Sequence, residues 1–186
     1  MNIGFALCGS FCTYEAVFPV MAELAQQHQL IPIFSFAASS VDSRFGDASA
    51  HIAAAEAICG HRALSTIADV EPIGPKKLLD ALVIAPCTGN TLAKLAHSIA
   101  DTPVTMAAKS HLRNGRPVIL AISSNDALAG AAENIGKLLG RKHYYFVPFG
   151  QDDPIGKPTS MIADFQKIPA AISAALEGKQ IQPILL

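Results

Sequence analysis

Polar side chains of the kinds that bind phosphates and carboxylates follow four separate apolar runs of this sequence. Small residues in a turn let its backbone N–H groups come close to an anion, and hydroxyl and amide side chains add further donors. If the four turns meet at one edge of a sheet, they form a ligand site there. The turns are Cys8-Gly9-Ser10, Ala37-Ala38-Ser39-Ser40, Pro86-Cys87-Thr88-Gly89-Asn90-Thr91 and Ser123-Ser124-Asn125-Asp126.

The first turn has the outline of a phosphate cradle. Gly9 permits a tight turn, and Ser10 and Thr13 place hydroxyls beside a helix start. A Ser/Thr helix cap explains these hydroxyls equally well. The second and third glycines of the G-x-G-x-x-G dinucleotide fingerprint are absent, so the turn does not predict classical NAD binding.

The second turn adds hydroxyls that we expect at the same place. Ser39 and Ser40 follow an apolar run that ends at Phe36. Together with Ser10 they could donate hydrogen bonds to one phosphate group. A polar surface loop is the simpler interpretation of Ser40 taken singly.

An asparagine lies near the start of the helix after each of the last two turns. Asn90 and Asn125 could cap these helices, which is the more common use, or bind the polar edge of a ring and a carboxylate. Because the two asparagines follow neighbouring strands and lie beside a phosphate cradle, the pair favours a ligand site over simple helix capping. Lys157, in the Gly/Pro-rich loop Phe149–Pro158, is a further candidate to bind an anion. Lys109, Arg113 and Arg116 are interpreted as a solvated face.

Five apolar runs have the length of buried strands, and helical patterns lie between them. Runs that are apolar throughout indicate strands buried on both faces, as in a parallel sheet covered by helices. Their spacing predicts βαβ units in one α/β domain over residues 1–186. Asn125 and Asp126 should cap a helix, and Pro169 should bend or interrupt the last one. The expected strands are Ile3–Leu7, Ile31–Phe36, Ala81–Ala85, Val118–Ile122 and Tyr144–Pro148; the expected helices are Thr13–Gln27, Ser49–Cys59, Asn90–Ala96, Pro103–Leu112, Asp126–Leu139 and Ser160–Glu177.

The composition narrows the classes of partner. A hydrophobic content of 51% with 16% charged residues and a mean hydropathy of +0.34 indicates apolar surface buried between subunits, so we expect a homo-oligomer. A net charge of −1 without a basic face argues against nucleic acid. No signal peptide or membrane span is recognisable, which predicts a cytoplasmic protein. The four cysteines and six histidines have no metal-site spacing, so no metal is expected.

One motif resembles the signature of a known family. Pro86-x-x-x-Asn90-Thr91-x-Ala93-Lys94-x-Ala96-x-x-Ile99-x-Asp101 is similar to the P-A-S-A-N-T-x-A-K-x-A-x-G-I-x-D motif of the FMN-binding cysteine decarboxylase superfamily. The resemblance implies a three-layer α/β/α, Rossmann-like (flavodoxin-like) fold and trimers, or multiples of them, with FMN between subunits. It also implies that Gly9, Ser10 and Ser39 hold the FMN phosphate, and that the flavin is lined by Thr88, Gly89, Asn90 and Thr91.

Other runs are similar to one branch of this superfamily, found in spore-forming bacteria. They are Cys12–Pro19, Thr88-Gly89-Asn90, Ser124–Leu128 and Pro148–Pro154. The branch implies a B subunit, in the mother cell of a sporulating bacterium, that acts with an NAD(P)-dependent A subunit to oxidise dihydrodipicolinate to dipicolinate. Asn90 and Asn125 would then orient the flavin edge and one substrate carboxylate, and Lys157 would neutralise the other.

Two departures from the superfamily pattern argue against decarboxylation. The position of the decarboxylases' catalytic histidine is Pro72 here, and proline has no group for acid–base chemistry. The late loop Phe149–Pro158 lacks the catalytic cysteine of phosphopantothenoylcysteine decarboxylase. An FMN-dependent decarboxylase of a cysteinyl substrate and a non-catalytic scaffolding subunit stay open as alternatives.

Overall fold

Parallel strands in the order β2-β1-β3-β4 form the centre of the computed structural model, which describes residues 1–186. β5 pairs in parallel with the start of β4, and the antiparallel hairpin β6–β7 pairs with its last two residues. The elements are β1 Asn2–Leu7, η1 Phe11–Thr13, α1 Tyr14–Ala25, β2 Gln29–Phe34, α2 Phe36–Ser40, α3 Ala48–Cys59, α4 Ile67–Val70, η2 Glu71–Ile73, β3 Ala81–Cys87, α5 Gly89–Ala96, α6 Pro103–Leu112, β4 Val118–Ser124, α7 Ala132–Leu139, β5 Tyr144–Phe146, β6 Phe149–Gly150, β7 Met161–Ala163, η3 Phe165–Lys167 and α8 Ile168–Leu176.

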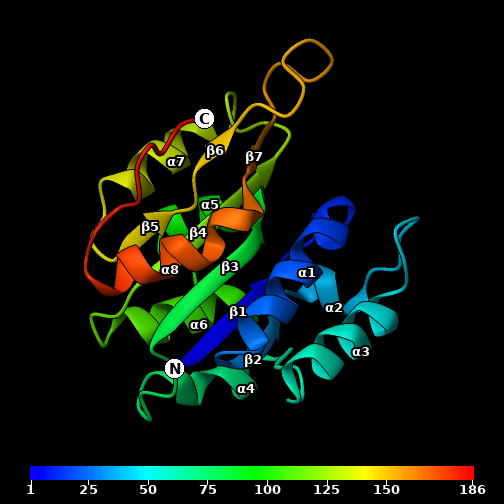
Figure 1. The fold of residues 1–186 in the computed structure, drawn as a ribbon, viewed down its shortest axis with the longest axis vertical. Coiled ribbons are helices and arrows are strands. Elements are labelled where there is room, and N and C mark those ends of the chain that lie inside the picture. The colour runs from blue at the N-terminus through cyan, green and yellow to red at the C-terminus, as the bar shows by residue number, and fades with distance from the viewer.

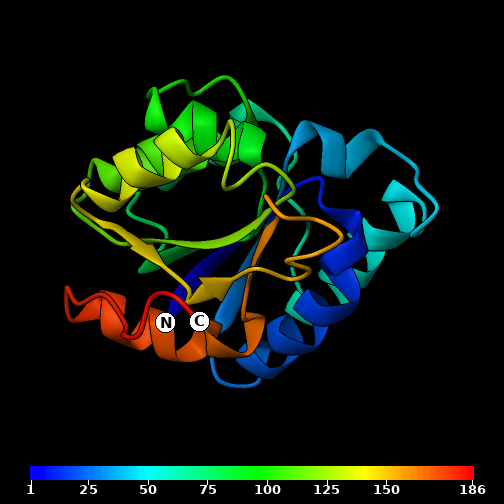
Figure 2. The ribbon, with the colours of Figure 1, turned by 90° about the horizontal axis from the view of Figure 1, so that it is seen from above.

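Helices cover both faces of this sheet, as the apolar strands predict. Figure 2 shows α5, α6 and α7 over one face and α1 and α8 over the other. Every residue of β3 and all but the last residue of β4 are buried. The three-layer α/β/α prediction is therefore confirmed, and the turns that follow β1, β2, β3 and β4 lie at one edge of the sheet.

Four strands end at residues other than those predicted; among them, β4 extends to Ser124 and β5 ends at Phe146. β2 ends at Phe34, and Ser35 caps the short helix α2 by accepting a hydrogen bond from the amide of Ala38. β3 continues through Pro86 to Cys87. The register of the β3–β4 pairing shifts between Ile84 and Cys87, which accommodates a residue that has no N–H to donate.

Two predicted helices begin later than expected. The carbonyl of Asp126 accepts hydrogen bonds from the amides of Ala129 and Ala131, which makes turns, so α7 begins at Ala132 and Asn125 caps no helix.

The predicted helix Ser160–Glu177 shortens to α8, Ile168–Leu176, because its first part forms β7 and η3. Pro169 lies in the first turn of α8, where its missing N–H costs nothing, and so neither bends nor interrupts it. The predicted loop Phe149–Pro158 likewise contributes its first two residues to β6.

None of the helices combines the length and the apolar character that a membrane span requires. No three His, Cys, Asp or Glu side chains are grouped in a way that could hold a metal ion.

A fully buried histidine makes the stability of the fold depend on pH. Nε2 of His111, at the end of α6, donates to the carbonyl of Pro117 at 3.1 Å, and Nδ1 has no partner. Burial, assisted by the nearby Arg116, lowers the pKa of His111 from 6.5 to about 4, against the raising effect of the hydrogen bond to Pro117. Below pH 6.5 the unfolded chain therefore binds a proton that the folded chain excludes.

We predict that the free energy of unfolding falls as the pH is lowered from 6.5 to about 4, with about 3 kcal/mol of the loss due to His111. A His111→Gln variant, which keeps an N–H donor but does not titrate, should lose correspondingly less stability over this range. Chemical denaturation at several pH values measures the free energy of unfolding of the parent protein and of the variant. His97→Gln, at an exposed position, is the control and should lose as much stability as the parent protein. An equal loss in the two variants would contradict the prediction.

Candidate functional site

A cleft of about 450 Å³ opens where the turns after β1, β2 and β3 meet. Its walls come from three neighbouring strand ends and from the α5–α6 segment. None of the lining side chains is acidic, so the cleft can accept an anion. The lining residues are Gly9, Ser35, Phe36, Ala37, Thr88, Asn90, Thr91, Lys94 and Thr102.

The turns after β1 and β2 form a narrow cradle at one end of this cleft. A Cβ atom added at Gly9 would lie 3.4 Å from Cβ of Ala37, so the two turns approach closely. No hydrogen bond within the chain takes up the backbone N–H groups of Gly9, Phe36 or Ala37. Free N–H donors around small residues suit a phosphate.

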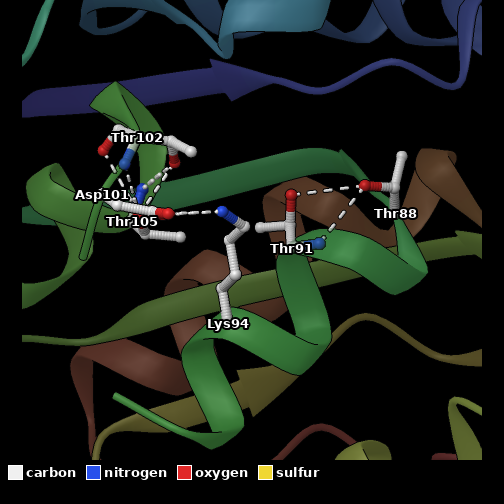
Figure 3. A network of polar contacts seen from close by, with 6 residues as sticks. All are labelled: Thr88, Thr91, Lys94, Asp101, Thr102 and Thr105. Atoms are coloured by element: carbon white, nitrogen blue, oxygen red, sulfur yellow. Dashed lines mark hydrogen bonds and ion pairs between the residues drawn. The ribbon is translucent and has the colours of Figure 1, made fainter. Parts of the chain in front are cut away.

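The third turn is held by hydroxyl groups and leaves one amide side chain free. Thr88 caps α5: its Oγ1 accepts a hydrogen bond from the amide of Thr91 at 3.5 Å and lies 3.2 Å from Oγ1 of Thr91 (Figure 3). Asn90 is exposed, and its carboxamide makes no hydrogen bond within the chain. Because a threonine does the capping, the carboxamide of Asn90 is available to a ligand.

A buried contact joins this turn to the first one. Oγ1 of Thr91 donates to Sγ of Cys8 at 3.3 Å. Burial raises the pKa of Cys8 to about 11, against the lowering effect of the Thr91 hydrogen bond. The thiol of Cys8 therefore stays protonated at neutral pH and serves the structure, since a thiolate is the reactive form.

Lys94 and Thr102 are cleft residues that sequence reasoning did not assign to the site. Nζ of Lys94 binds both carboxylate oxygens of Asp101, at 2.7 and 2.8 Å, which lowers the pKa of Asp101 (Figure 3). Thr102 caps α6 together with Thr105. Lys94 follows Thr91 by three residues and so shares its side of the helix, which is the signal that could have identified it.

Three predicted cofactor residues lie outside the cleft lining. Oγ of Ser10 is 2.8 Å from Oγ of Ser123. Oγ of Ser39 donates to the carbonyl of Phe36 within α2, and Ser35 occupies the strand end where Ser39 was expected. Gly89 faces the fourth turn: a Cβ there would lie 2.9 Å from both Oγ of Ser124 and Oδ1 of Asp126.

Asn125 and Lys157 also lie outside the lining, on two loops that contact each other. The carbonyl of Asn125 accepts a hydrogen bond from Oγ1 of Thr159 at 2.7 Å. Nζ of Lys157 pairs with Asp152 at 3.0 Å, which raises the pKa of Lys157. Figure 1 shows this β6–β7 loop projecting beyond the carboxyl ends of the central strands. Neither side chain therefore lines the cleft.

Comparisons with known proteins match the chain over most or all of its length. The family model described as Flavoprotein matches residues 1–172. The chain is 47% identical to the B subunit of dipicolinate synthase of Bacillus subtilis (strain 168), over 100% of this chain and 93% of that protein. The crystal structure of the dipicolinate synthase B subunit from Bacillus halodurans C is 42% identical, with a TM-score of 0.91, covering 100% of this chain and 95% of that one. The FMN-dependent cysteine decarboxylase SpaF is 25% identical, with a TM-score of 0.66, covering 94% and 97%.

We predict that Gly89→Ala destabilises the protein by no more than about 1 kcal/mol, because the added methyl group displaces the ends of the Ser124 and Asp126 side chains and breaks their 2.6 Å hydrogen bond, while both side chains can turn away. Gly136→Ala is the matched control: no atom lies within 4 Å of the added Cβ in α7, so it should stabilise the helix by about 1 kcal/mol. Urea denaturation of both variants measures the difference, and equal effects would contradict this packing at the third turn.

Proposed function

Because the chain belongs to the Flavoprotein family, and within it groups with the B subunits of dipicolinate synthase, we propose that it is a flavin-binding subunit of that enzyme. It acts with a separate NAD(P)-dependent A subunit to oxidise dihydrodipicolinate to dipicolinate during sporulation. The observation that carries the proposal is the full-length 47% identity to a subunit of this enzyme, together with a cleft suited to an anionic cofactor.

The residues around the cleft fit FMN. The free N–H groups of Gly9, Phe36 and Ala37 receive the phosphate, and the absence of a lining carboxylate avoids repulsion. Asn90 presents its carboxamide to the polar edge of the flavin ring. Lys94 lies on the same side of α5 as Thr91, and Asp101 balances its charge. When bound, FMN supplies a group that accepts two electrons, and the cleft's residues bind and orient it.

The two contacting loops that carry Asn125 and Lys157 bind the substrate. Dihydrodipicolinate carries two carboxylates, and Asn125 and Lys157 lie on the two contacting loops. The carboxamide of Asn125 orients one carboxylate. The ammonium of Lys157, held by Asp152 until substrate arrives, neutralises the second. The nicotinamide site belongs to the A subunit.

The working form is a homo-oligomer, a trimer or a multiple of three. Large apolar side chains on α2 and the segment after it are solvent-exposed: Phe36 at 47%, Val41 at 45% and Phe45 at 47%. Phe36 also lines the cleft, so a second copy of the chain that covers these side chains would border the flavin.

FMN-dependent decarboxylation of a cysteinyl substrate is a second candidate function, favoured by the similarity to SpaF over 94% of this chain. Pro72, at the position of the decarboxylases' histidine, lies in η2 and does not line the cleft. The chain has no cysteine after Cys87. These residues therefore favour oxidation over decarboxylation.

We predict that the purified chain quenches FMN fluorescence on titration, and that Asn90→Ala weakens FMN binding about tenfold, the effect of one lost hydrogen bond. Asn90 is exposed and makes no contact that folding requires, so the variant should fold. Asn134→Ala, on α7 and outside the cleft, is the control and should bind FMN like the parent. Equal dissociation constants for the two variants, or no binding by the parent, would refute the assignment of this cleft.

We predict that the chain forms product from dihydrodipicolinate only when mixed with the A subunit, and that Lys157→Ala raises the KM for dihydrodipicolinate about tenfold through loss of one charged contact. Lys179→Ala is the matched control, since Lys179 is also exposed and paired with an acid, at the end of α8. Absorbance of the pyridine product measures the dependence on the A subunit and the KM of each variant.

Two outcomes would exclude this function. Unchanged activity of the complex after replacement of both Asn90 and Asn125 by alanine would favour a scaffolding role. Release of carbon dioxide from a cysteinyl substrate, abolished by Asn90→Ala, would favour the decarboxylase.

A further inference from the structure

A second cleft, of about 350 Å³, lies between the end of α5, the helix α6 and the start of β5. It shares no lining residue with the cleft described above. Its lining combines apolar side chains with three cations. The lining residues are Leu95, Ser98, Ile99, Ala100, Thr105, Lys109, Leu112, Arg113, Arg141 and Tyr144.

The cations of this second cleft have no acidic partner. The ion pairs of the protein join Lys94, Arg116, Lys157 and Lys179 to carboxylates, and none of them includes Lys109, Arg113 or Arg141. No lining residue is acidic. Lys109 and Arg113 are four residues apart at the end of α6, a spacing at which like charges repel. A bound anion would relieve this repulsion.

The three basic residues at this helix end differ in their surroundings. Arg116 pairs with Asp80 at 3.5 Å, away from the second cleft. Lys109 and Arg113 are exposed but line the cleft. The positive charges of Lys109 and Arg113 therefore favour an anionic ligand in the second cleft.

Arg141 and Tyr144 give the second cleft a fixed wall. The guanidinium of Arg141 donates to the carbonyl of Leu95 at 3.0 Å and to that of Ala96 at 2.7 Å, which satisfies the carboxyl end of α5. Burial raises the pKa of the half-buried Tyr144 to about 12, so its hydroxyl stays a neutral donor. The wall is thus in place before a ligand arrives.

We propose that this second cleft binds a small carboxylate built on one aromatic or alicyclic ring. The ring packs on Leu95, Ile99 and Leu112, and the carboxylate lies between Lys109 and Arg113. A concave site of this volume, half apolar and with a few polar groups on one side, has the form of a small-molecule site. The proposal is independent of FMN binding, which uses other residues.

Isothermal titration of the full-length protein with benzoate, at low salt, tests the proposal. The double variant Lys109→Gln/Arg113→Gln should bind benzoate at least tenfold more weakly than the parent. Lys76→Gln/Lys137→Gln makes the same change of charge at exposed positions outside both clefts and should bind like the parent. Far-ultraviolet circular dichroism and the midpoint of urea unfolding show that each variant is folded.

Benzamide, which has the same ring without the charge, should bind more weakly than benzoate to the parent protein. Three results would overturn the proposal: no heat of binding with benzoate, equal affinity in the two double variants, or equal affinity for benzoate and benzamide.

Discussion

Hydrogen bonds between the carboxyl ends of different strands hold the candidate flavin cleft in place. The Thr91 hydroxyl reaches Cys8 from the third turn to the first, and Ser10 reaches Ser123 on β4. These contacts lie partly or fully out of water, where a lost partner costs more than the bond itself contributes. The cleft therefore depends on polar contacts made within the protein itself. Burial also keeps the thiols of Cys8 and Cys87 protonated, because it raises the pKa of each.

The proposed cofactor residues and the proposed substrate residues are positioned by different kinds of structure. The phosphate cradle and the Asn90 turn lie on strands buried on both faces, so their backbone positions are fixed by the core. Asn125 and Lys157 lie on surface loops that contact each other through Thr159. The fixed backbone at the strand ends suits a cofactor that stays bound. The surface loops suit a substrate that must enter and leave.

The sequence was sufficient to predict the parallel sheet, because continuous apolar runs separated by helical patterns have few other solutions. It also indicated Gly9, Thr88, Asn90 and Thr91, which all line the cleft. Ser39 was expected where Ser35 lies, because Phe36 prolongs the apolar run although it is 47% exposed. The strand Met161–Ala163 depends on pairing with Ser123 and Ser124, far away in the chain, and so has no local signal. The second cleft depends in the same way on how α5, α6 and β5 pack.

A crystal structure of the protein grown with FMN tests the central claim most directly. We expect the FMN phosphate beside the backbone N–H groups of Gly9, Phe36 and Ala37, with the flavin ring against Asn90 and Thr91. FMN bound at another place, or a cleft that stays empty at saturating FMN, would contradict this account of the site.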